Sequence, residues 1–352
     1  MMAWGVAAVA FVLGSAGLWA LSTRINRRVE RAVPADGRFV EVDGERIHYV
    51  DEGQGPVLVM IHGLSGCGRN LTHSLSPRLR EQFRVITLDR PGSGYSSRSA
   101  GAGVSITAQA RLIARFIEIL HLGRPLVVGH SLGGALALAL ALNHPQRVSA
   151  LVLLAPLTHP QRMLPLVFLS LGVRPDFIRR WFAQTLAAPM AMLGRGGLLK
   201  AVFAPERPPA DFAERGGGLL AMRSGNFYCA SSEIATVNDD LPKMVRRYPQ
   251  LDLPVGLVYG SRDAVLDYRR HGESMARLVP GLQLDILEGR GHMLPVTAVE
   301  PVVAMVRAIA ARANEQQGHP ATRNVCGHTF LKRVSGGPDG FTHDIQNDGK
   351  NS

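Results

Sequence analysis

Cysteine is scarce in this chain, with 3 residues among 352. Cys67, Cys229 and Cys326 cannot form a disulfide framework, so the sequence is compatible with a reducing compartment. Their spacing matches no zinc-binding pattern, and we therefore expect no metal site. We interpret Cys67 as a small buried side chain; a reactive thiol is the alternative.

Motifs for nucleotide binding are also missing. The sequence contains neither G-x-G-x-x-G nor G-x-x-x-x-G-K-[ST], so a dinucleotide-dependent or P-loop enzyme lacks its minimum evidence. Lysine is rare as well: only four of the 39 basic residues are Lys, and the arginines are scattered along the chain. The net charge of +11 is therefore best explained by a general Arg- and Ala-rich bias in composition; attraction to anionic lipid or acidic substrates is the second explanation, and we expect no nucleic-acid partner.

The first 23 residues contain no charged side chain, and Ala3 to Leu21 are apolar apart from Gly and Ser. At about 1.5 Å per residue this stretch is just long enough to cross a bilayer core. Four arginines follow between residues 24 and 31. Under the positive-inside rule we expect a single-pass membrane anchor over 1–23, a basic linker over 24–37 and a cytoplasmic catalytic domain. A cleaved signal peptide that exports the protein is the alternative, although the basic n-region is missing.

The chain contains one G-x-S-x-G, with the sequence G-H-S-L-G at 129–133. An apolar strand-like run, 125–128, precedes it, and an Ala- and Leu-rich stretch of helical composition, 135–142, follows. A serine on such a sharp strand-to-helix turn exposes its hydroxyl, and the N-terminus of the helix favours negative charge there. Ser131 is therefore the candidate nucleophile.

A nucleophilic serine needs a neutral imidazole as base and a carboxylate to orient that imidazole. His292 lies in a glycine-containing loop after the strand-like run 282–287. Asp263 follows the buried-strand pattern 254–259; Asp267 is a nearby competitor that instead suits the start of a helix. The chain order Ser131, Asp263, His292 is the order expected for an α/β-hydrolase triad.

A third strand-like run, 56–61, ends in His62-Gly63-Leu64. We expect the backbone N–H groups of Leu64 and Leu132 to form an oxyanion hole for a tetrahedral intermediate. We interpret His62 as structural, because it falls at the strand end and faces the loop backbone.

Taken together and in order, these residues resemble the α/β-hydrolase superfamily over about residues 38–313. The matching pieces are His62-Gly63, the turn 89–96 (D-R-P-G-S-G-Y-S), G-H-S-L-G, Gly260-Ser261-Arg262-Asp263 and Gly291-His292. The resemblance implies an α/β fold with a mostly parallel eight-stranded sheet, flanking helices and a helical cap inserted after the sixth strand. It also implies serine hydrolysis without a cofactor. Related epoxide hydrolases and haloalkane dehalogenases use Asp as the nucleophile, and Ser131 occupies that position here. We interpret Asp89 as scaffold.

The domain organisation follows from where the alternation of strand-like and helical runs breaks. We expect the hydrolase core over 38–156 and 251–313, the cap over 157–250 and a disordered tail over 314–352. The cap is rich in Leu, Met, Phe and Pro, which favours an apolar pocket.

Our main functional hypothesis is a membrane-anchored serine hydrolase that cleaves a lipophilic carboxylic ester. The same triad is also compatible with cleavage of a C–C bond or an amide. A third hypothesis is a non-catalytic protein that binds a lipophilic ligand or a membrane partner. The sequence leaves the oligomeric state open.

Overall fold

The structure is a computed structural model that describes residues 2–99, 101–161, 163, 165–318 and 330–334. Its centre is a nine-stranded sheet in the order β1-β2-β4-β3-β5-β6-β7-β8-β9. The strands are β1 (Arg38–Val42), β2 (Glu45–Glu52), β3 (Val57–Ile61), β4 (Arg84–Leu88), β5 (Leu126–His130), β6 (Ala150–Leu154), β7 (Val255–Gly260), β8 (Gln283–Leu287) and β9 (Phe330–Val334).

The sheet is mostly parallel, as expected. Only β2 runs antiparallel to its neighbours β1 and β4. The inner strands consist of short apolar runs, and β5, β6 and β7 are buried along their full length. Such runs are typical of a parallel sheet that is covered on both faces.

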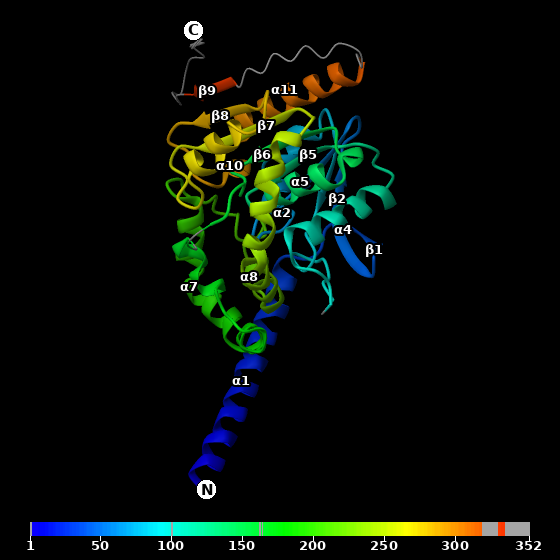
Figure 1. Ribbon diagram of the computed structural model, residues 1–352. Helices are drawn as coiled ribbons and strands as arrows, with labels where there is room; N and C mark the ends of the chain where they lie inside the picture. The colour runs from blue at the N-terminus through cyan, green and yellow to red at the C-terminus, as the bar shows by residue number, and fades with distance from the viewer. Residues whose placement is uncertain (1, 100, 162, 164, 319–329, 335–352) are drawn as a thin grey trace.

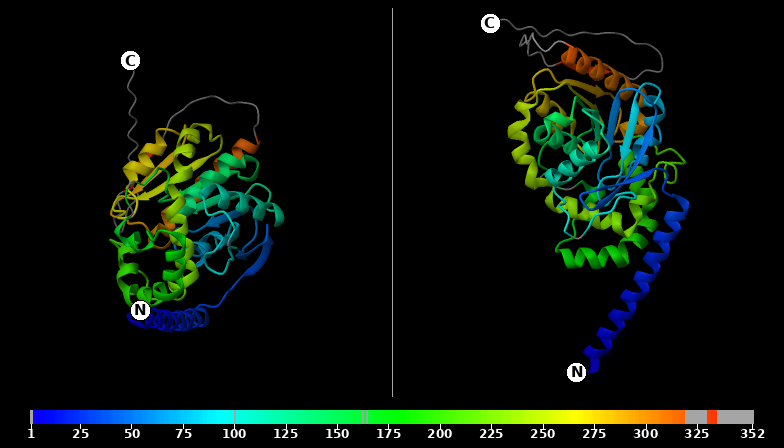
Figure 2. Two further views of the ribbon diagram at one scale, coloured as in Figure 1. Left: turned by 60° about the horizontal axis from the view of Figure 1, so that its bottom comes forward. Right: turned by 90° about the vertical axis from the view of Figure 1, so that its right-hand side faces the viewer.

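Helices cover both faces of this sheet (Figures 1 and 2). The principal ones in the core are α4 (Ile106–Ile119), α5 (Leu132–Asn143) and α11 (Val299–Gly318). Helix α5 is buried from Leu132 to Leu142, which explains why its sequence is Ala and Leu with no polar face.

The register of the parallel strands brings their carboxyl ends to one edge of the sheet. Ile61 of β3 pairs with Gly129 of β5, and Leu154 of β6 pairs with His130 of β5 and with Val258 of β7. The loops that follow β3, β5 and β7 therefore start close together. In open α/β sheets this edge is where ligands bind.

The segment between β6 and β7 forms a helical cap, again as expected. It contains η2 (Leu166–Leu171), α6 (Asp176–Phe182), η3 (Ala183–Ala187), α7 (Ala188–Phe203), η4 (Leu220–Met222) and α8 (Ser224–Arg247). Figure 1 shows α7 and α8 at the end of the molecule from which α1 projects.

Helix α1 (Met2–Ala32) continues well beyond the uncharged segment. Residues 24–32, which we expected to belong to a linker, are therefore helical. The physical reason is that this part of the helix packs on the cap: Val29 is buried against cap residues, Asn26 hydrogen-bonds Ser224, and Glu30 pairs with Arg223.

The expected disordered tail differs from the structure in two places. Helix α11 extends to Gly318, five residues beyond the predicted boundary at Ala313. Residues 330–334 form β9, which pairs with β8 in parallel and extends the eight expected strands to nine. Residues 319–329 and 335–352 lie outside the described part of the chain.

Candidate active site

Ser131 lies on the turn between β5 and α5, where the sequence predicts it. Its backbone has φ 55° and ψ −120°, a conformation that non-glycine residues rarely adopt. Strain of this kind costs about 1–3 kcal/mol and is common where a side chain is held out for function. Ser131 is nonetheless mostly buried, so the hydroxyl lies beneath the cap.

The glycines that flank Ser131 allow close backbone contacts. A Cβ at Gly133 would lie 2.2 Å from the carbonyl oxygen of Ile61, at the end of β3. A Cβ at Gly129 would lie 2.6 Å from the carbonyl oxygen of Gly133. Only glycine fits at either position, and this explains the spacing of G-x-S-x-G physically.

Asp263 and His292 are in direct contact. The Nδ1 atom of His292 donates a hydrogen bond to Oδ2 of Asp263 at 2.7 Å. The other oxygen, Oδ1, accepts the backbone N–H groups of Val265 and Leu266 at 2.8 and 2.9 Å. Burial acts to raise the pKa of Asp263, but the charge and hydrogen bond of His292 and these two N–H groups hold it below its usual value. Asp263 is thus an ionised, oriented partner for His292.

Asp267, the competing carboxylate, lies elsewhere. It is exposed, and its Oδ1 accepts the backbone N–H of Arg269 at 3.0 Å, at the start of η6 (Arg269–Glu273). This is the helix-start role that its position in the sequence favours.

His130, which precedes Ser131, was not singled out from the sequence. Its Nε2–H donates to the backbone carbonyl of His292 at 3.0 Å, and the two rings lie 4.9 Å apart. Burial, followed by the proximity of His292, lowers the pKa of His130 to about 3, so the ring is neutral at physiological pH. His130 therefore fixes the backbone of the loop that carries His292.

The cap also contacts this loop. Gly291, immediately before His292, donates its N–H to Oε2 of the cap residue Glu206 at 2.9 Å. On the core side, Arg262 donates its N–H to the carbonyl of Arg290 at 2.9 Å. The loop is thus held by hydrogen bonds from both layers.

The loop after β3 passes next to Ser131. A Cβ placed on Gly63 would lie 3.0 Å from the Cβ of Ser131. The next residue, Leu64, is therefore also close to the proposed nucleophile. Leu132 is the first residue of α5, and the first N–H groups of a helix have no acceptor within it. Both proposed oxyanion donors, Leu64 and Leu132, therefore belong to segments that adjoin the serine.

His62 has structural hydrogen bonds on both ring nitrogens. Its Nδ1–H donates to the carbonyl of Gly63, and its Nε2 accepts the N–H of Arg90, both at 2.9 Å. Burial, together with the nearby charge of Arg90, lowers the pKa of His62 to about 3. The ring is thus neutral, and its two hydrogen bonds stabilise the conformation of the loop.

Arg90 and the cap residue Glu233 form a buried ion pair that the sequence did not reveal. Their side chains are 0% and 2% exposed, and Nη1 and Nη2 of Arg90 donate to the two carboxylate oxygens at 2.6 and 3.1 Å. Nη2 also donates to the carbonyl of Gly63 at 3.1 Å. Such bidentate pairs are geometrically specific. This one connects helix α8 of the cap to the loop beside Ser131.

Asp89 is part of the scaffold, in agreement with its interpretation from the sequence. Its carboxylate accepts the N–H groups of Gly68 and Tyr95 at 2.6 and 2.8 Å and the Nδ1–H of His48 at 2.8 Å. Burial opposes ionisation, but the hydrogen bond and charge of His48 hold the pKa of Asp89 below its usual value.

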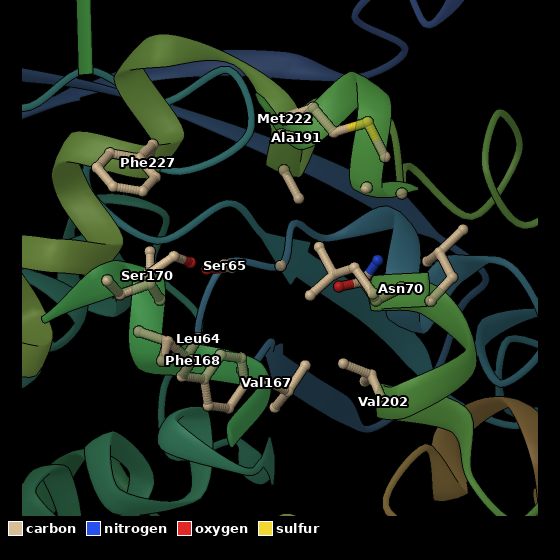
Figure 3. A pocket seen from close by; sticks show the side chains of 18 of the residues that line it. Leu64, Ser65, Asn70, Val167, Phe168, Ser170, Ala191, Val202, Met222 and Phe227 are labelled. Atoms are coloured by element: carbon tan, nitrogen blue, oxygen red, sulfur yellow. The ribbon is translucent and has the colours of Figure 1, made fainter. Parts of the chain in front are cut away.

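Ser131 and His292 face the same cavity, which has a volume of about 290 Å³. Its walls are mainly apolar side chains of the cap, and Figure 3 shows Val167, Phe168, Ala191, Val202, Met222 and Phe227 around it. No Asp, Glu, Lys or Arg lines this cavity in the part of the chain that the structure describes. A smaller cavity of about 50 Å³ reaches Ser131 from the side of Leu132 and Leu157.

Cys67 is buried, and its thiol lies near the carbonyl of Gly217. Burial and the nearby charge of Asp89 raise the pKa of Cys67 to about 12. This favours the interpretation as an inert apolar side chain over a reactive thiol. Within the described ranges, no group of three or more His, Cys, Asp or Glu residues is arranged to hold a metal ion.

Two helices are long and apolar enough to cross a membrane by length and composition. The first is Ala3–Ala32 and the second is Asp176–Phe203 in the cap; an apolar window of 18 residues within each has a mean hydropathy of 1.8 and 1.2, respectively. Only 6% and 17% of their apolar windows are buried within the protein. This is a weak indication of membrane association.

Comparison with known proteins identifies relatives of this chain. Residues 56–298 match the family described as alpha/beta hydrolase fold. Haloalkane dehalogenase 2 from Mycobacterium tuberculosis is 37% identical over 115 residues, which are 33% of this chain and 40% of that protein. A 2-hydroxy-6-oxononadienedioate/2-hydroxy-6-oxononatrienedioate hydrolase from Burkholderia vietnamiensis is 37% identical over 126 residues, 33% of this chain and 43% of that protein. The chain thus spans less than half the length of both curated relatives.

The match extends further among solved structures. A thermophilic esterase from Thermogutta terrifontis superposes with a TM-score of 0.64 and 21% identity, and the match covers 79% of this chain and 99% of the esterase. At this identity the likeness concerns the fold alone.

Proposed function

This chain belongs to the α/β-hydrolase fold family, and from that premise we propose that it is a serine hydrolase that cleaves lipophilic carboxylic esters. Ser131 is the proposed nucleophile, His292 the base and Asp263 the residue that orients His292. The observation that carries the proposal is the hydrogen bond of 2.7 Å between His292 and Asp263 beside a cavity that Ser131 and His292 share.

In the proposed reaction, the Ser131 hydroxyl attacks the ester carbonyl while Nε2 of His292 takes its proton. The carbonyl oxygen becomes an oxyanion, which accepts hydrogen bonds from the N–H groups of Leu64 and Leu132. One such donor contributes about 3 kcal/mol to transition-state stabilisation. The protonated His292 then gives its proton to the leaving alcohol. A water molecule, activated by His292 in the same way, hydrolyses the acyl-enzyme and restores the serine.

The lining of the cavity supports an uncharged, lipophilic substrate. A charged substrate group would lose its hydration in this apolar space without a charged partner to replace it. The larger cavity suits a long apolar chain, and the smaller cavity, which Ser131 also lines, suits a short group. We therefore propose an ester with one long and one short substituent.

Cleavage of a C–C bond is the alternative that the Burkholderia vietnamiensis relative raises. The substrate that its name prints is a dicarboxylate. The described lining of the cavity offers no Arg or Lys to pair with two carboxylates. This favours an ester over such a dienedioate.

We propose that residues 3–21 of α1 anchor the enzyme in a membrane. Their side chains are exposed almost throughout, and they carry no charge. The four arginines that follow favour the cytoplasmic side for the hydrolase domain.

Labelling with a fluorophosphonate probe tests the proposed nucleophile. We expect the folded wild-type protein to form one covalent adduct on Ser131, and Ser131→Ala to form none. Ser170→Ala is the matched control, because Ser170 lines the same cavity and is expected to leave labelling unchanged. Absence of an adduct in folded wild type, or equal labelling of Ser131→Ala, would refute the proposal. Turnover of p-nitrophenyl esters of increasing chain length, beside amide and dienoate substrates, then defines the bond that is cleaved.

A further inference from the structure

Exposed apolar side chains are concentrated on one end of the molecule. Among the described residues, every exposed large hydrophobic side chain except Phe39 lies on α1 or in the cap between residues 163 and 193. In the cap the most exposed are Leu193 at 89% and Leu166 at 86%, and Phe177 is 72% exposed. We call the following set the cap face: Met163, Leu166, Leu169, Phe177, Ile178, Trp181, Met190 and Leu193.

The cap face is continuous with the proposed anchor. Trp181 stacks on Phe11 with ring centroids 5.8 Å apart, and its Nε1–H donates to Oγ of Ser15 at 3.3 Å. About two turns further along α1, Ser22 donates to the carbonyl of Thr185, which lies about one turn after Trp181, at 2.7 Å. Figures 1 and 2 show α1 leaving the molecule alongside the cap helices.

These contacts fix the depth of the cap relative to the anchor. Ser15 precedes Arg24 by nine residues, which is about 13 Å along a helix axis. If the apolar stretch of α1 spans the hydrocarbon and Arg24 lies among the headgroups, Trp181 lies below the headgroups as well. Placing α1 in the bilayer therefore immerses the adjoining part of the cap.

The charges near the cap face are compatible with this position. Asp176 of α6 pairs with both Arg179 and Arg180, and it accepts the hydroxyl of Tyr228 at 3.0 Å. Charged groups at the membrane are tolerated when they pair with one another in this way. The remaining basic residues nearby, on α1 and α7, favour anionic headgroups.

From these observations we propose that the cap face docks into the adjacent leaflet of an anionic phospholipid bilayer, so that the lipophilic ester enters the cavity from the acyl-chain region. Met190 connects the two environments, because it lines the cavity and is also 52% exposed on the outer surface. This inference rests on the proposed anchor, and the experiment below separates the two.

Tryptophan fluorescence provides the test, because the chain has 3 tryptophans: Trp4 and Trp19 in α1 and Trp181 in the cap face. The full-length protein is reconstituted in phosphatidylcholine–phosphatidylglycerol vesicles with brominated acyl chains, which quench tryptophan at the depth of the hydrocarbon. The variant W4F/W19F reports on Trp181 alone, and W19F/W181F reports on Trp4 alone. We expect both variants to lose fluorescence relative to vesicles without bromine.

Each outcome has a distinct meaning. Quenching of Trp181 supports docking of the cap face, whatever Trp4 shows. Quenching of Trp4 with unchanged Trp181 overturns the docking and leaves the anchor in place, which is also the result expected if a second copy of the chain covers the cap face. No quenching of either tryptophan overturns both proposals.

A second experiment measures activity after a charge is introduced on the cap face, outside the proposed catalytic residues. Phe177→Glu and Leu193→Glu place a carboxylate on the cap face, and Phe39→Glu on β1 is the matched control, because Phe39 is 40% exposed and far along the chain from the cap. We expect the two cap variants to lose turnover of a vesicle-borne long-chain ester while they retain turnover of a short soluble ester. Equal loss on both substrates, or equal loss in Phe39→Glu, would contradict entry from the bilayer.

Discussion

Removal of the charge on Glu233 should destabilise the protein strongly, because it leaves Arg90 buried without its counter-ion. Both side chains are almost completely enclosed, at 0% and 2% exposure, so water cannot replace the lost partner. Breaking a buried pair by removing one member costs about 3–5 kcal/mol. We therefore expect Glu233→Gln to lower the free energy of unfolding by about that amount.

The measurement is urea unfolding of the full-length protein in detergent micelles, followed by circular dichroism. Glu300→Gln is the matched control, because Glu300 pairs with Arg78 on the surface, where both side chains are more than half exposed. An exposed pair of this kind contributes little to stability, because water screens both charges. If Glu233→Gln and Glu300→Gln lower the free energy of unfolding by the same amount, the prediction for the buried pair is wrong.

A second variant separates the buried charge from the lost hydrogen bonds. Arg90→Met/Glu233→Gln removes the uncompensated cation as well, so it should be more stable than Glu233→Gln alone. A double variant that is equally unstable or less stable would show that the cost comes from the bonds of Arg90 to Gln109 and Gly63, which are 3.0 and 3.1 Å long.

Two further predictions concern the carboxylate that we propose orients His292 and a buried histidine. Asp263→Asn should lower kcat for ester hydrolysis about 10⁴-fold, because the amide no longer holds His292 in the required tautomer; Asp267→Asn is the control, and equal losses in steady-state kinetics would reject the assignment of Asp263. Burial, then His159 and Arg270, lower the pKa of His271 to about 3, whereas the unfolded chain takes up this proton near pH 6.5. The stability that a neutral His271 contributes is therefore complete above about pH 6.5 and is lost as the pH falls toward 3. His271→Gln should reduce the slope of the unfolding free energy against pH in this range by about 1.4 kcal/mol per pH unit. The control is His121→Gln, at an exposed position. If the slope for His271→Gln is as steep as the slope for His121→Gln, the prediction is wrong.

The strand ends were predictable from the sequence because they depend on local patterns. Short apolar runs followed by glycine-containing turns located β3, β5, β7 and β8, and parallel strands place their carboxyl ends at one edge. This logic predicted that Asp263 and His292 come together, and their side chains share a hydrogen bond, whereas Asp267 accepts the N–H of Arg269.

Contacts between distant segments could not be predicted in this way. Arg90 and Glu233 are 143 residues apart, and although Arg90 belongs to the turn 89–96, nothing in that motif indicates a partner in the cap. His130 was visible only as a variable position of G-x-S-x-G, although its imidazole fixes the His292 loop. Such contacts depend on how segments far apart in the sequence pack together, and the hydrophobic periodicity of the sequence does not specify this packing.

The ends of the chain show the same limit. The arginines after the apolar stretch suggested a linker, but Val29 and Val33 bury against the cap and keep the segment helical to Ala32. Strand β9 lies in a polar region without alternation, and its pairing with β8 supplies the order that its own composition does not predict.

The two cap carboxylates that contact the core have a consequence for protein engineering. Glu233 is connected through Arg90 to Gly63 in the loop after β3, and Glu206 holds the loop that carries His292. A cap grafted from another hydrolase to change substrate range would remove both supports at once. Chimaeras of this enzyme should therefore transplant the new lining while they retain these two acidic positions, or the recipient core will lose the geometry on which turnover depends.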